Sequence, residues 1–265
     1  MGYKDPQQQK EYQQKHYQSN KHLVLQRQQV RRKKVEENAI QSLYTGCILN
    51  TSLWSSWFKN KTYKNTRFVY NLSEIDAFEL LIKKCFYCGS FATTLDRLDS
   101  NLNHTKNNCV GCCEFCNNSK QAQDPKTFIL QAVYRRLFIC YDDDIIWDDN
   151  TSKPRLRGYK EKALKQGKIF ELSETDFDAY TINRCHYCRR FPPKGSFFGI
   201  DKMFPDDGYV IGNCITACVS CNRAKWNAAP ADFTLRDERI TQRYLIGVFD
   251  DLPNISKNIS HQKNK

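Results

Sequence analysis

The chain contains the stretch Cys109-Val-Gly-Cys-Cys-Glu-Phe-Cys-Asn-Asn-Ser-Lys120, and a similar stretch follows as Cys214-Ile-Thr-Ala-Cys-Val-Ser-Cys-Asn-Arg-Ala-Lys225. Both hold the pattern Cys-x-x-Cys-Asn-x-x-Lys, and Cys113 and Cys218 are 105 positions apart. An earlier cysteine pair precedes each stretch, as Cys85-Phe-Tyr-Cys88 and Cys185-His-Tyr-Cys188, 100 positions apart. The similarity extends over roughly 55–135 and 157–245, so the sequence indicates a duplicated module.

The cysteine spacing favours metal binding. A structural zinc ion takes four ligands, and a Cys-x-x-Cys turn, here called a knuckle, presents two thiolates to one ion. Interlocked pairs of knuckles are typical of zinc sites rather than of redox-active pairs or disulfides, which are the alternatives. The predicted ligands are Cys85, Cys88, Cys113 and Cys116 for one ion, and Cys185, Cys188, Cys218 and Cys221 for a second.

Five cysteines remain outside these pairs. We expect buried apolar positions for Cys47, Cys109, Cys140 and Cys214. Cys112 has no counterpart in the second copy, where Ala217 stands at its place.

The composition points to a polyanionic partner. The net charge of the 265 residues is +12 and the pI is about 9.1, which favours nucleic acid first and an anionic membrane surface second. A charge that only keeps the protein soluble is the alternative. The sequence has no run of eighteen apolar residues and its N-terminus is polar, so we expect a soluble intracellular protein, with nucleus, cytoplasm and virion not distinguished.

Five segments are predicted along the chain. They are a basic Gln/Lys-rich arm at 1–50, a zinc module at 51–140, an acidic linker at 141–156, a second zinc module at 157–250 and a polar tail at 251–265. The arm has few apolar residues, so it is either disordered or a solvated helix that orders on a partner.

Helices are predicted on both sides of the knuckles. The expected spans are 52–66, Ser73 to Lys84, Tyr159 to Gln166, and a helix that starts after Ser173. In the helix after Ser73, the inner face is expected to carry Ile75, Phe78, Leu81 and Ile82; in the helix after Ser173, Phe177 and Tyr180. A helix should begin at the last cysteine of each module. Pro125 and Pro230 should then open helices whose apolar runs, 128–138 and 233–248, pack on their own modules.

The segments between the knuckles carry matched polar residues. Asp96 lies 17 positions before Cys113, and Asp201 lies 17 positions before Cys218. Asn108 and Asn213 match in the same way. An Asp at a strand end can simply cap a turn, and Asn117 and Asn222 could cap a helix, so a structural role is an open alternative.

Together these motifs resemble the zinc-containing branch of the HNH endonucleases, including phage and large-virus members. The resemblance covers both modules and implies an α+β fold made of two tandem treble-clef-like, ββα-metal modules. It implies that Asp96 with Asn117, and Asp201 with Asn222, hold a catalytic Mg²⁺ or Mn²⁺, and that Asn108 and Asn213 are structural.

Both copies depart from this family at the catalytic histidine, which is Arg97 in one and Lys202 in the other. An arginine cannot accept a proton near neutral pH, and a lysine could do so only with a strongly lowered pKa. His104 could replace the base only if its loop folds back. Arg97, Lys120, Lys202 and Lys225 are instead suited to bind phosphates.

The sequence therefore predicts a zinc-dependent nucleic-acid-binding protein, with DNA favoured over RNA and no membrane partner. The basic helices at 59–67 and 160–168 would face phosphates. A divalent-metal-dependent HNH endonuclease is the first alternative, so enzyme status stays open. The second is a structural protein of a larger assembly, such as a virion.

Overall fold

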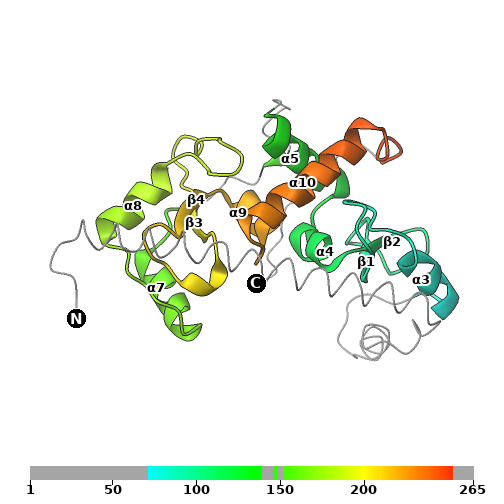
Figure 1. The fold of residues 1–265 in the computed structure, drawn as a ribbon, viewed down its shortest axis with the longest axis horizontal. Helices are drawn as coiled ribbons and strands as arrows, with labels where there is room; N and C mark the ends of the chain where they lie inside the picture. The colour runs from blue at the N-terminus through cyan, green and yellow to red at the C-terminus, as the bar shows by residue number, and fades with distance from the viewer. Residues whose placement is uncertain (1–70, 139–145, 148–151, 253–265) are drawn as a thin grey trace. The chain divides into compact units, whose positions relative to one another are not determined.

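The computed structural model describes residues 71–138, 146–147 and 152–252 (Figure 1). Several predictions lie outside these residues: the basic arm, the helix at 52–66, the basic stretch 59–67, most of the acidic linker, the tail beyond 252, Cys47 and Cys140. The chain divides into two compact units. The first unit contains the described residues up to Ile146 together with Arg236–Leu252, and the second unit contains Trp147–Leu235.

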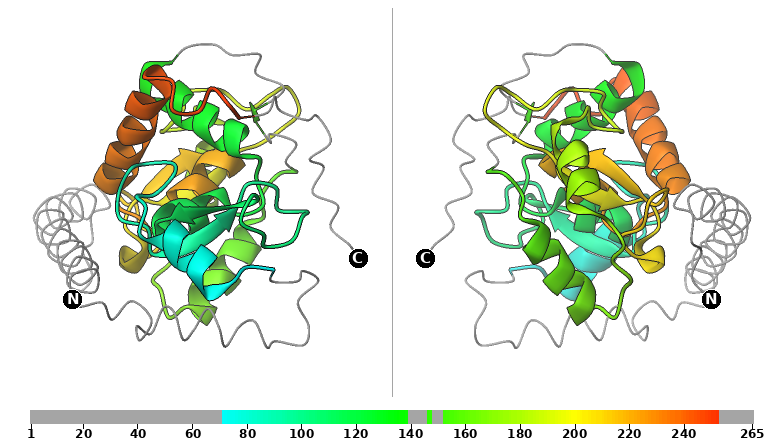
Figure 2. Two further views of the ribbon diagram at one scale, coloured as in Figure 1. Left: turned by 90° about the vertical axis from the view of Figure 1, so that its right-hand side faces the viewer. Right: turned by 90° about the vertical axis from the view of Figure 1, so that its left-hand side faces the viewer.

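The first unit is a small mixed α+β fold. Its elements are α3 (Glu74–Leu81), β1 (Thr94–Arg97), β2 (Cys109–Cys112), α4 (Glu114–Lys120) and α5 (Pro125–Leu137). β1 and β2 form an antiparallel pair in which Thr94 lies opposite Cys112 and Arg97 opposite Cys109. Helix α3, cyan in Figure 2, packs on both strands, and α4 packs on β1.

The second unit repeats this arrangement. Its elements are α7 (Leu156–Lys165), α8 (Glu174–Ile182), β3 (Gly199–Lys202), the 3₁₀ turn η2 (Pro205–Asp207), β4 (Cys214–Ala217), α9 (Val219–Lys225) and the start of α10 (Pro230–Leu245). Gly199 pairs with Ala217 and Lys202 with Cys214, which is the register of β1 and β2 shifted by 105 positions. Small antiparallel sheets with flanking helices agree with the predicted α+β class.

Helices α3 and α8 begin as predicted. The hydroxyl oxygens of Ser73 and Ser173 each accept a hydrogen bond from the backbone N–H three residues on, and the carboxylates of Asp76 and Asp176 accept one from the serine N–H. These reciprocal bonds form a capping box that satisfies two free backbone donors at the helix start.

The predicted inner face of α3 is wrong for two of its residues. Ile75 is 71% exposed and Ile82 is 46% exposed, while Leu72, Ala77 and Leu80 are buried in one cluster. Leu72 precedes the cap and Ala77 lies in the first turn, so the pair forms a hydrophobic staple that fixes which side of the helix turns inward. The helix also ends at Leu81, three residues before the predicted end at Lys84.

Helices α4 and α9 begin at Glu114 and Val219, two residues before the predicted starts at Cys116 and Cys221. The first cysteine of the second knuckle is the N-cap in each unit: the Sγ atoms of Cys113 and Cys218 accept the backbone N–H of Cys116 and Cys221 at 3.3 and 3.4 Å. Asn117 and Asn222 lie inside these helices, so neither caps one.

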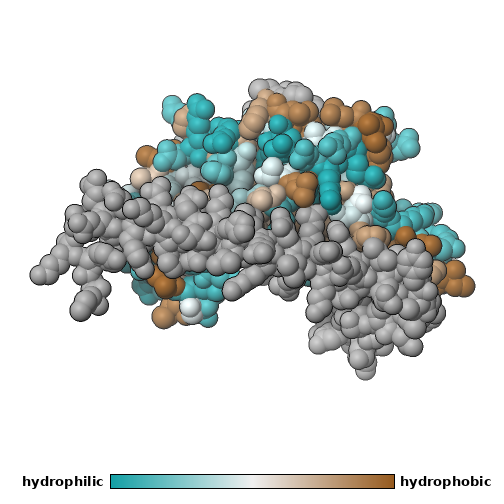
Figure 3. Space-filling view, viewed as in Figure 1, coloured by the Kyte–Doolittle hydropathy of each residue, from teal (hydrophilic) through white to brown (hydrophobic). Residues whose placement is uncertain are grey.

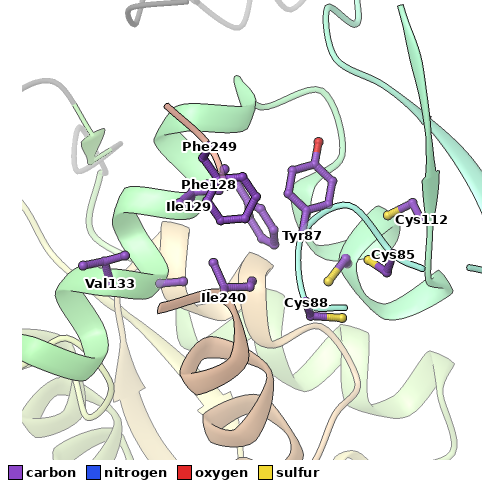
Figure 4. Packing of buried hydrophobic residues seen from close by; sticks show 11 residues of the cluster. Cys85, Tyr87, Cys88, Cys112, Phe128, Ile129, Val133, Ile240 and Phe249 are labelled. Carbon is purple, nitrogen blue, oxygen red and sulfur yellow. The ribbon is translucent and has the colours of Figure 1, made fainter. Parts of the chain in front are cut away.

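Helix α5 starts as predicted, with Asp124 as N-cap and Pro125 in the first turn. The prediction that the apolar run 233–248 packs on its own module is wrong for most of helix α10. Phe233 contacts Tyr187 of the second unit, but from Arg236 onward the chain belongs to the first unit. There Ile240 and Phe249 share a core cluster with Tyr87 and Phe128 (Figure 4).

A buried ion pair supports the assignment of the chain from Arg236 onward to the first unit. Asp237 of α10 accepts from Arg135 Nε at 2.6 Å, and each side chain is 2% exposed. Burial of a charge is tolerated only when it is paired, so Asp237 and Arg135 must be buried together. The second unit runs from Trp147 to Leu235, whereas the predicted second module runs from 157 to 250.

The described surface seen in Figure 3 is mostly hydrophilic, with hydrophobic residues near the C-terminal end of α10. Leu245 and Ile246 are exposed there. Within the described residues, no helix combines the length and apolar character needed to cross a membrane.

Candidate metal centres and the aspartates beside them

The structure brings together the two sets of four cysteines that the sequence predicts. The first set is Cys85, Cys88, Cys113 and Cys116, and the second is Cys185, Cys188, Cys218 and Cys221. Within each set all sulfur atoms lie within 4.8 Å of one another. In each unit, the first two ligands lie on a knuckle that follows α3 or α8 and precedes the two strands. The other two lie on a knuckle that follows the strands and opens α4 or α9.

The sulfur separations fit a tetrahedral ion. Cys88 Sγ lies 3.7 Å from Cys113 Sγ, and Cys188 Sγ lies 3.9 Å from Cys218 Sγ. A tetrahedron with zinc–sulfur bonds of about 2.3 Å places its sulfurs about 3.8 Å apart. Both clusters can therefore hold a metal ion, and four thiolates are a donor set typical of structural zinc.

The acidity of the thiols differs within each cluster. Neighbouring thiols hydrogen-bond to Cys85 and Cys185 and hold the pKa of both well below the usual range. Hydrogen bonding, first from Cys113, lowers the pKa of Cys88 to about 7. Burial instead raises the pKa of Cys116 and of Cys221 in the same two clusters.

Cys109 and Cys214 occupy the buried positions that the sequence predicts. Burial raises the pKa of Cys109 to about 11 and that of Cys214 to about 12, so both stay protonated at neutral pH. Cys112 is also fully buried, and burial raises its pKa too.

Asp96 is held in a buried network in the first unit. The hydroxyl of Tyr87 donates to Asp96 Oδ2 at 2.6 Å, and Lys120 Nζ donates to Asp96 Oδ1 at 3.1 Å. Lys120 also donates to the carbonyl oxygen of Arg97 at 2.9 Å. The network links the first knuckle, strand β1 and the end of helix α4.

The second unit contains the same network. Tyr187 donates to Asp201 Oδ2 at 2.7 Å, and Lys225 Nζ lies 3.1 Å from the same oxygen. Lys225 also donates to the carbonyl oxygen of Lys202 at 2.9 Å. Neither tyrosine was predicted as a site residue, although the Cys-x-Tyr-Cys pattern shared by the first knuckles was a signal for them.

Burial and pairing act against each other in these networks. Burial raises the pKa of Asp96 and of Asp201, and the facing lysine opposes this rise. Burial lowers the pKa of Lys225, and Asp201 opposes that change. Each carboxylate thus has a lysine as its buried partner.

A lysine lies beside each aspartate that the family resemblance assigns to a divalent ion. Both oxygens of Asp96 and of Asp201 already accept from a tyrosine or a lysine. Asn117 turns its amide nitrogen to Thr94 Oγ1 at 3.0 Å and to the carbonyl of Leu95 at 3.3 Å. Asn222 is half-buried at the matching place in α9.

The positions of Lys120 and Lys225 do not fit the predicted phosphate contacts. Both side chains are 0% exposed, because each points from the helix end into the sheet toward its aspartate. An ammonium without exposed surface cannot meet a phosphate in this conformation. The sequence did hold one signal for these pairs, because the spacing from Asp96 to Lys120 equals the spacing from Asp201 to Lys225. A buried lysine needs an opposite charge beside it.

Arg97 and Lys202 lie closer to the surface. Both are half-buried at the ends of β1 and β3. Arg97 Nη1 donates to the carbonyl of Leu102 at 2.8 Å, and Lys202 Nζ donates to the carbonyl of Pro205 at 3.0 Å. These bonds hold the basic side chains over the loop that follows each strand.

His104 belongs to the loop after β1 and matches Tyr209 of the second unit. Its carbonyl accepts the N–H of Asn71, as the carbonyl of Tyr209 accepts the N–H of Glu171. Burial, with the nearby charge of Arg97, lowers the pKa of His104 to about 4. The imidazole is therefore neutral at pH 7.

Asn108 and Asn213 clamp the loops in both units. Asn108 accepts from the N–H of Asp99 and donates to two loop carbonyls, at 2.9 to 3.0 Å. Asn213 makes the same set of bonds to Phe204 and Gly208. This matches the structural role that the resemblance implies for these residues.

Comparison with known proteins gives one viral relative. An uncharacterized protein of Acanthamoeba polyphaga mimivirus is 28% identical over 202 residues, which cover 74% of this chain and 38% of that protein. The chain thus spans well under half the length of this relative. No family model matches the sequence. Among solved structures, the rare-cutting HNH restriction endonuclease PacI aligns at 20% identity over 42% of this chain and 93% of its own, with a TM-score of 0.28.

Proposed function

We propose that the chain is a zinc-dependent nucleic-acid-binding protein built from two HNH-like modules that do not cleave their ligand. The observation that carries the proposal is the buried Asp–Lys pair found in both units. The resemblance to HNH nucleases assigns a divalent ion to each of these aspartates. The basic residues Arg97 and Lys202 stand where that family has its general base.

Loss of the base and loss of the ion act on the same reaction step. General-base catalysis contributes roughly 10²- to 10⁴-fold in rate, and a divalent ion would otherwise activate the attacking water. With a lysine in place of the ion and a cation in place of the base, a bound phosphodiester is held without a nucleophile. This combination favours binding over cleavage.

Two structural zinc ions complete the proposal. The predicted ligands of each cluster have the spacing of a tetrahedral sulfur site. An ion in each cluster would fix the two knuckles, and through Tyr87 and Tyr187 it would fix the aspartate networks. Small modules of this kind usually need their metal to fold.

Nucleic acid is the partner that the charge favours. The 265 residues carry a net charge of +12. Lysines and arginines that contact phosphates would release counterions from the nucleic acid, so affinity should fall steeply with salt concentration. Two modules in one chain would add avidity without any new type of contact. DNA is the form proposed.

A plasmid assay tests the proposal. Zinc-loaded protein is incubated with supercoiled plasmid in Mg²⁺, Mn²⁺ or EDTA, beside an Asp96→Ala/Asp201→Ala variant. We expect a salt-sensitive mobility shift and no nicking under any condition. Nicking that needs both the divalent ion and the aspartates would make the protein an endonuclease, and indifference to DNA and RNA would instead support a structural role in an assembly.

A further inference from the structure

A group of lysines in the second unit carries an inference that rests on the proposed function and makes it more specific. Lys202 ends strand β3, Lys162 lies in helix α7, and Lys168 follows that helix. Helix α7 is fixed on the strand by Tyr159, whose hydroxyl accepts the N–H of Ile200 at 3.1 Å. The three lysines, here called the basic triad, thus come from elements that are packed on one another.

Two tyrosines and a loop hold the triad together. The ring of Tyr209 lies 5.5 Å from that of Tyr159, and Lys202 Nζ lies 4.8 Å from the centre of the Tyr209 ring. Tyr209 also donates its backbone N–H to Ile169, the residue after Lys168. Buried Tyr209 therefore positions both Lys202 and the segment that carries Lys168.

The charges of the triad repel one another. Lys202 Nζ donates to the carbonyl of Pro205 at 3.0 Å and Lys168 Nζ donates to the carboxylate of Asp206 at 2.8 Å, so both lysines meet the turn η2. In agreement with this, burial lowers the pKa of Lys202, and the nearby positive charges of Lys168 and Lys162 lower it further. A like-charge group is unfavourable in the free protein, and an anion that binds among the three ammonium groups would relieve the repulsion. The buried carboxylate of Asp201 is already neutralised by Lys225.

One carboxylate competes for the triad. Asp206 accepts from Lys168 Nζ at 2.8 Å, but its side chain is 92% exposed. Exposed ion pairs contribute little to stability, so a phosphate could displace Asp206 from Lys168 at small cost.

In the first copy Arg97 stands 105 positions before Lys202, so the residue at the end of this strand is basic in both copies.

We propose that Lys162, Lys168 and Lys202 form a binding site for the phosphodiester backbone of DNA, with Asp206 as the group that the phosphate displaces. The three ammonium groups offer point charges without a base-reading geometry, so contacts are to phosphates rather than to base edges. Binding at this site is therefore insensitive to sequence.

The test is the salt dependence of binding of the full-length, zinc-loaded chain to a short fluorescein-labelled DNA duplex, followed by anisotropy. In the Lys162→Gln/Lys168→Gln/Lys202→Gln variant, the slope of log K against log salt should fall by about 0.9 for each lysine. Asp206→Asn should bind about two- to fivefold more tightly, because it removes the competing carboxylate. Lys194→Gln, an exposed lysine in the loop before β3, should keep the wild-type slope.

Zinc content and thermal midpoint show that each variant is folded. The inference is overturned if the triple variant keeps the wild-type affinity and slope, or if Lys194→Gln loses as much slope as one triad lysine. Weaker binding by Asp206→Asn would also overturn it, since that residue would then be a ligand contact. In these cases the proposed function stands, whereas a wild-type chain that does not bind the duplex removes both.

Discussion

Lys120 Nζ donates a hydrogen bond to Asp96 Oδ1 at 3.1 Å, and neither side chain has more than 4% of its surface exposed. Lys225 and Asp201 repeat this relationship in the second unit. A buried ion pair is weak evidence for stability in itself, because desolvation of both charges offsets most of their attraction. Removal of one partner alone is costly, however, because it leaves the other charge buried and unpaired. This difference between removing one charge and removing both makes the pair testable.

Lys120→Met should destabilise the first unit by about 3–5 kcal/mol, because the Asp96 carboxylate would stay buried without its partner. Chemical unfolding of the zinc-loaded chain measures this loss. The double variant Asp96→Asn/Lys120→Met removes both charges and should recover much of it. If Lys120→Met unfolds like the wild type, Asp96 is not held by Lys120, and a divalent ion at Asp96 becomes the better account.

Removal of one zinc ligand should lower the zinc content of the chain from two ions to one. Cys88→Ser should empty the first cluster and Cys188→Ser the second, since each cluster has four ligands and no shared one. Atomic absorption on purified protein measures the metal. Cys109→Ala is the matched control, because Cys109 is buried and protonated but lies outside the cluster, and it should keep both ions.

The sequence predicted what depends on local spacing. Both four-cysteine sets, the serine caps and the matched aspartates follow from short patterns that repeat at a fixed distance. The charged partners of those aspartates were harder to identify, because a lysine at a helix end is normally exposed. Only the packed structure shows that Lys120 and Lys225 turn inward to meet a carboxylate.

The assignment of α10 could not be predicted for a different reason. The repeat places residues 236–248 with the second module, and an amphipathic helix does not encode which core its apolar face will meet. Ile240 and Asp237 find their partners in the first unit, far away in sequence. Such long-range pairing depends on the tertiary structure and leaves no local signal.

Ile240→Ala should therefore destabilise the first unit and not the second. Ile240 is fully buried among Tyr87, Phe128 and Phe249, and a cavity at such a site costs about 2–5 kcal/mol. Hydrogen exchange followed by mass spectrometry can report the two units separately. Faster exchange should appear in α5 and around the first knuckle, with 174–225 unchanged.

Leu245→Ala is the matched control for this experiment. It removes an apolar side chain from the same helix, but Leu245 is 64% exposed, so exchange should stay as in the wild type. Faster exchange confined to the second unit in Ile240→Ala would contradict the assignment of this segment.

His104→Tyr should reduce the acid sensitivity of the first unit, since it installs the residue that the second unit has at this place. The pKa of His104 is lowered from 6.5 to about 4 by burial and by Arg97. The unfolded chain therefore binds a proton at higher pH than the folded chain. The stabilising contribution is present above pH 6.5 and is lost as pH falls through 6.5 toward 4. Because the side chain is only half-buried, solvent screening reduces this contribution to roughly 1 kcal/mol.

Thermal midpoints of the wild type and the variant at pH 7 and pH 5 measure the effect. The midpoint should fall less on acidification in His104→Tyr than in the wild type. The acid lability of cysteine-bound zinc is common to both proteins and cancels in this difference. An equal fall in both would mean that His104 binds its proton as readily in the folded chain as in the unfolded one, and that Arg97 does not act on it.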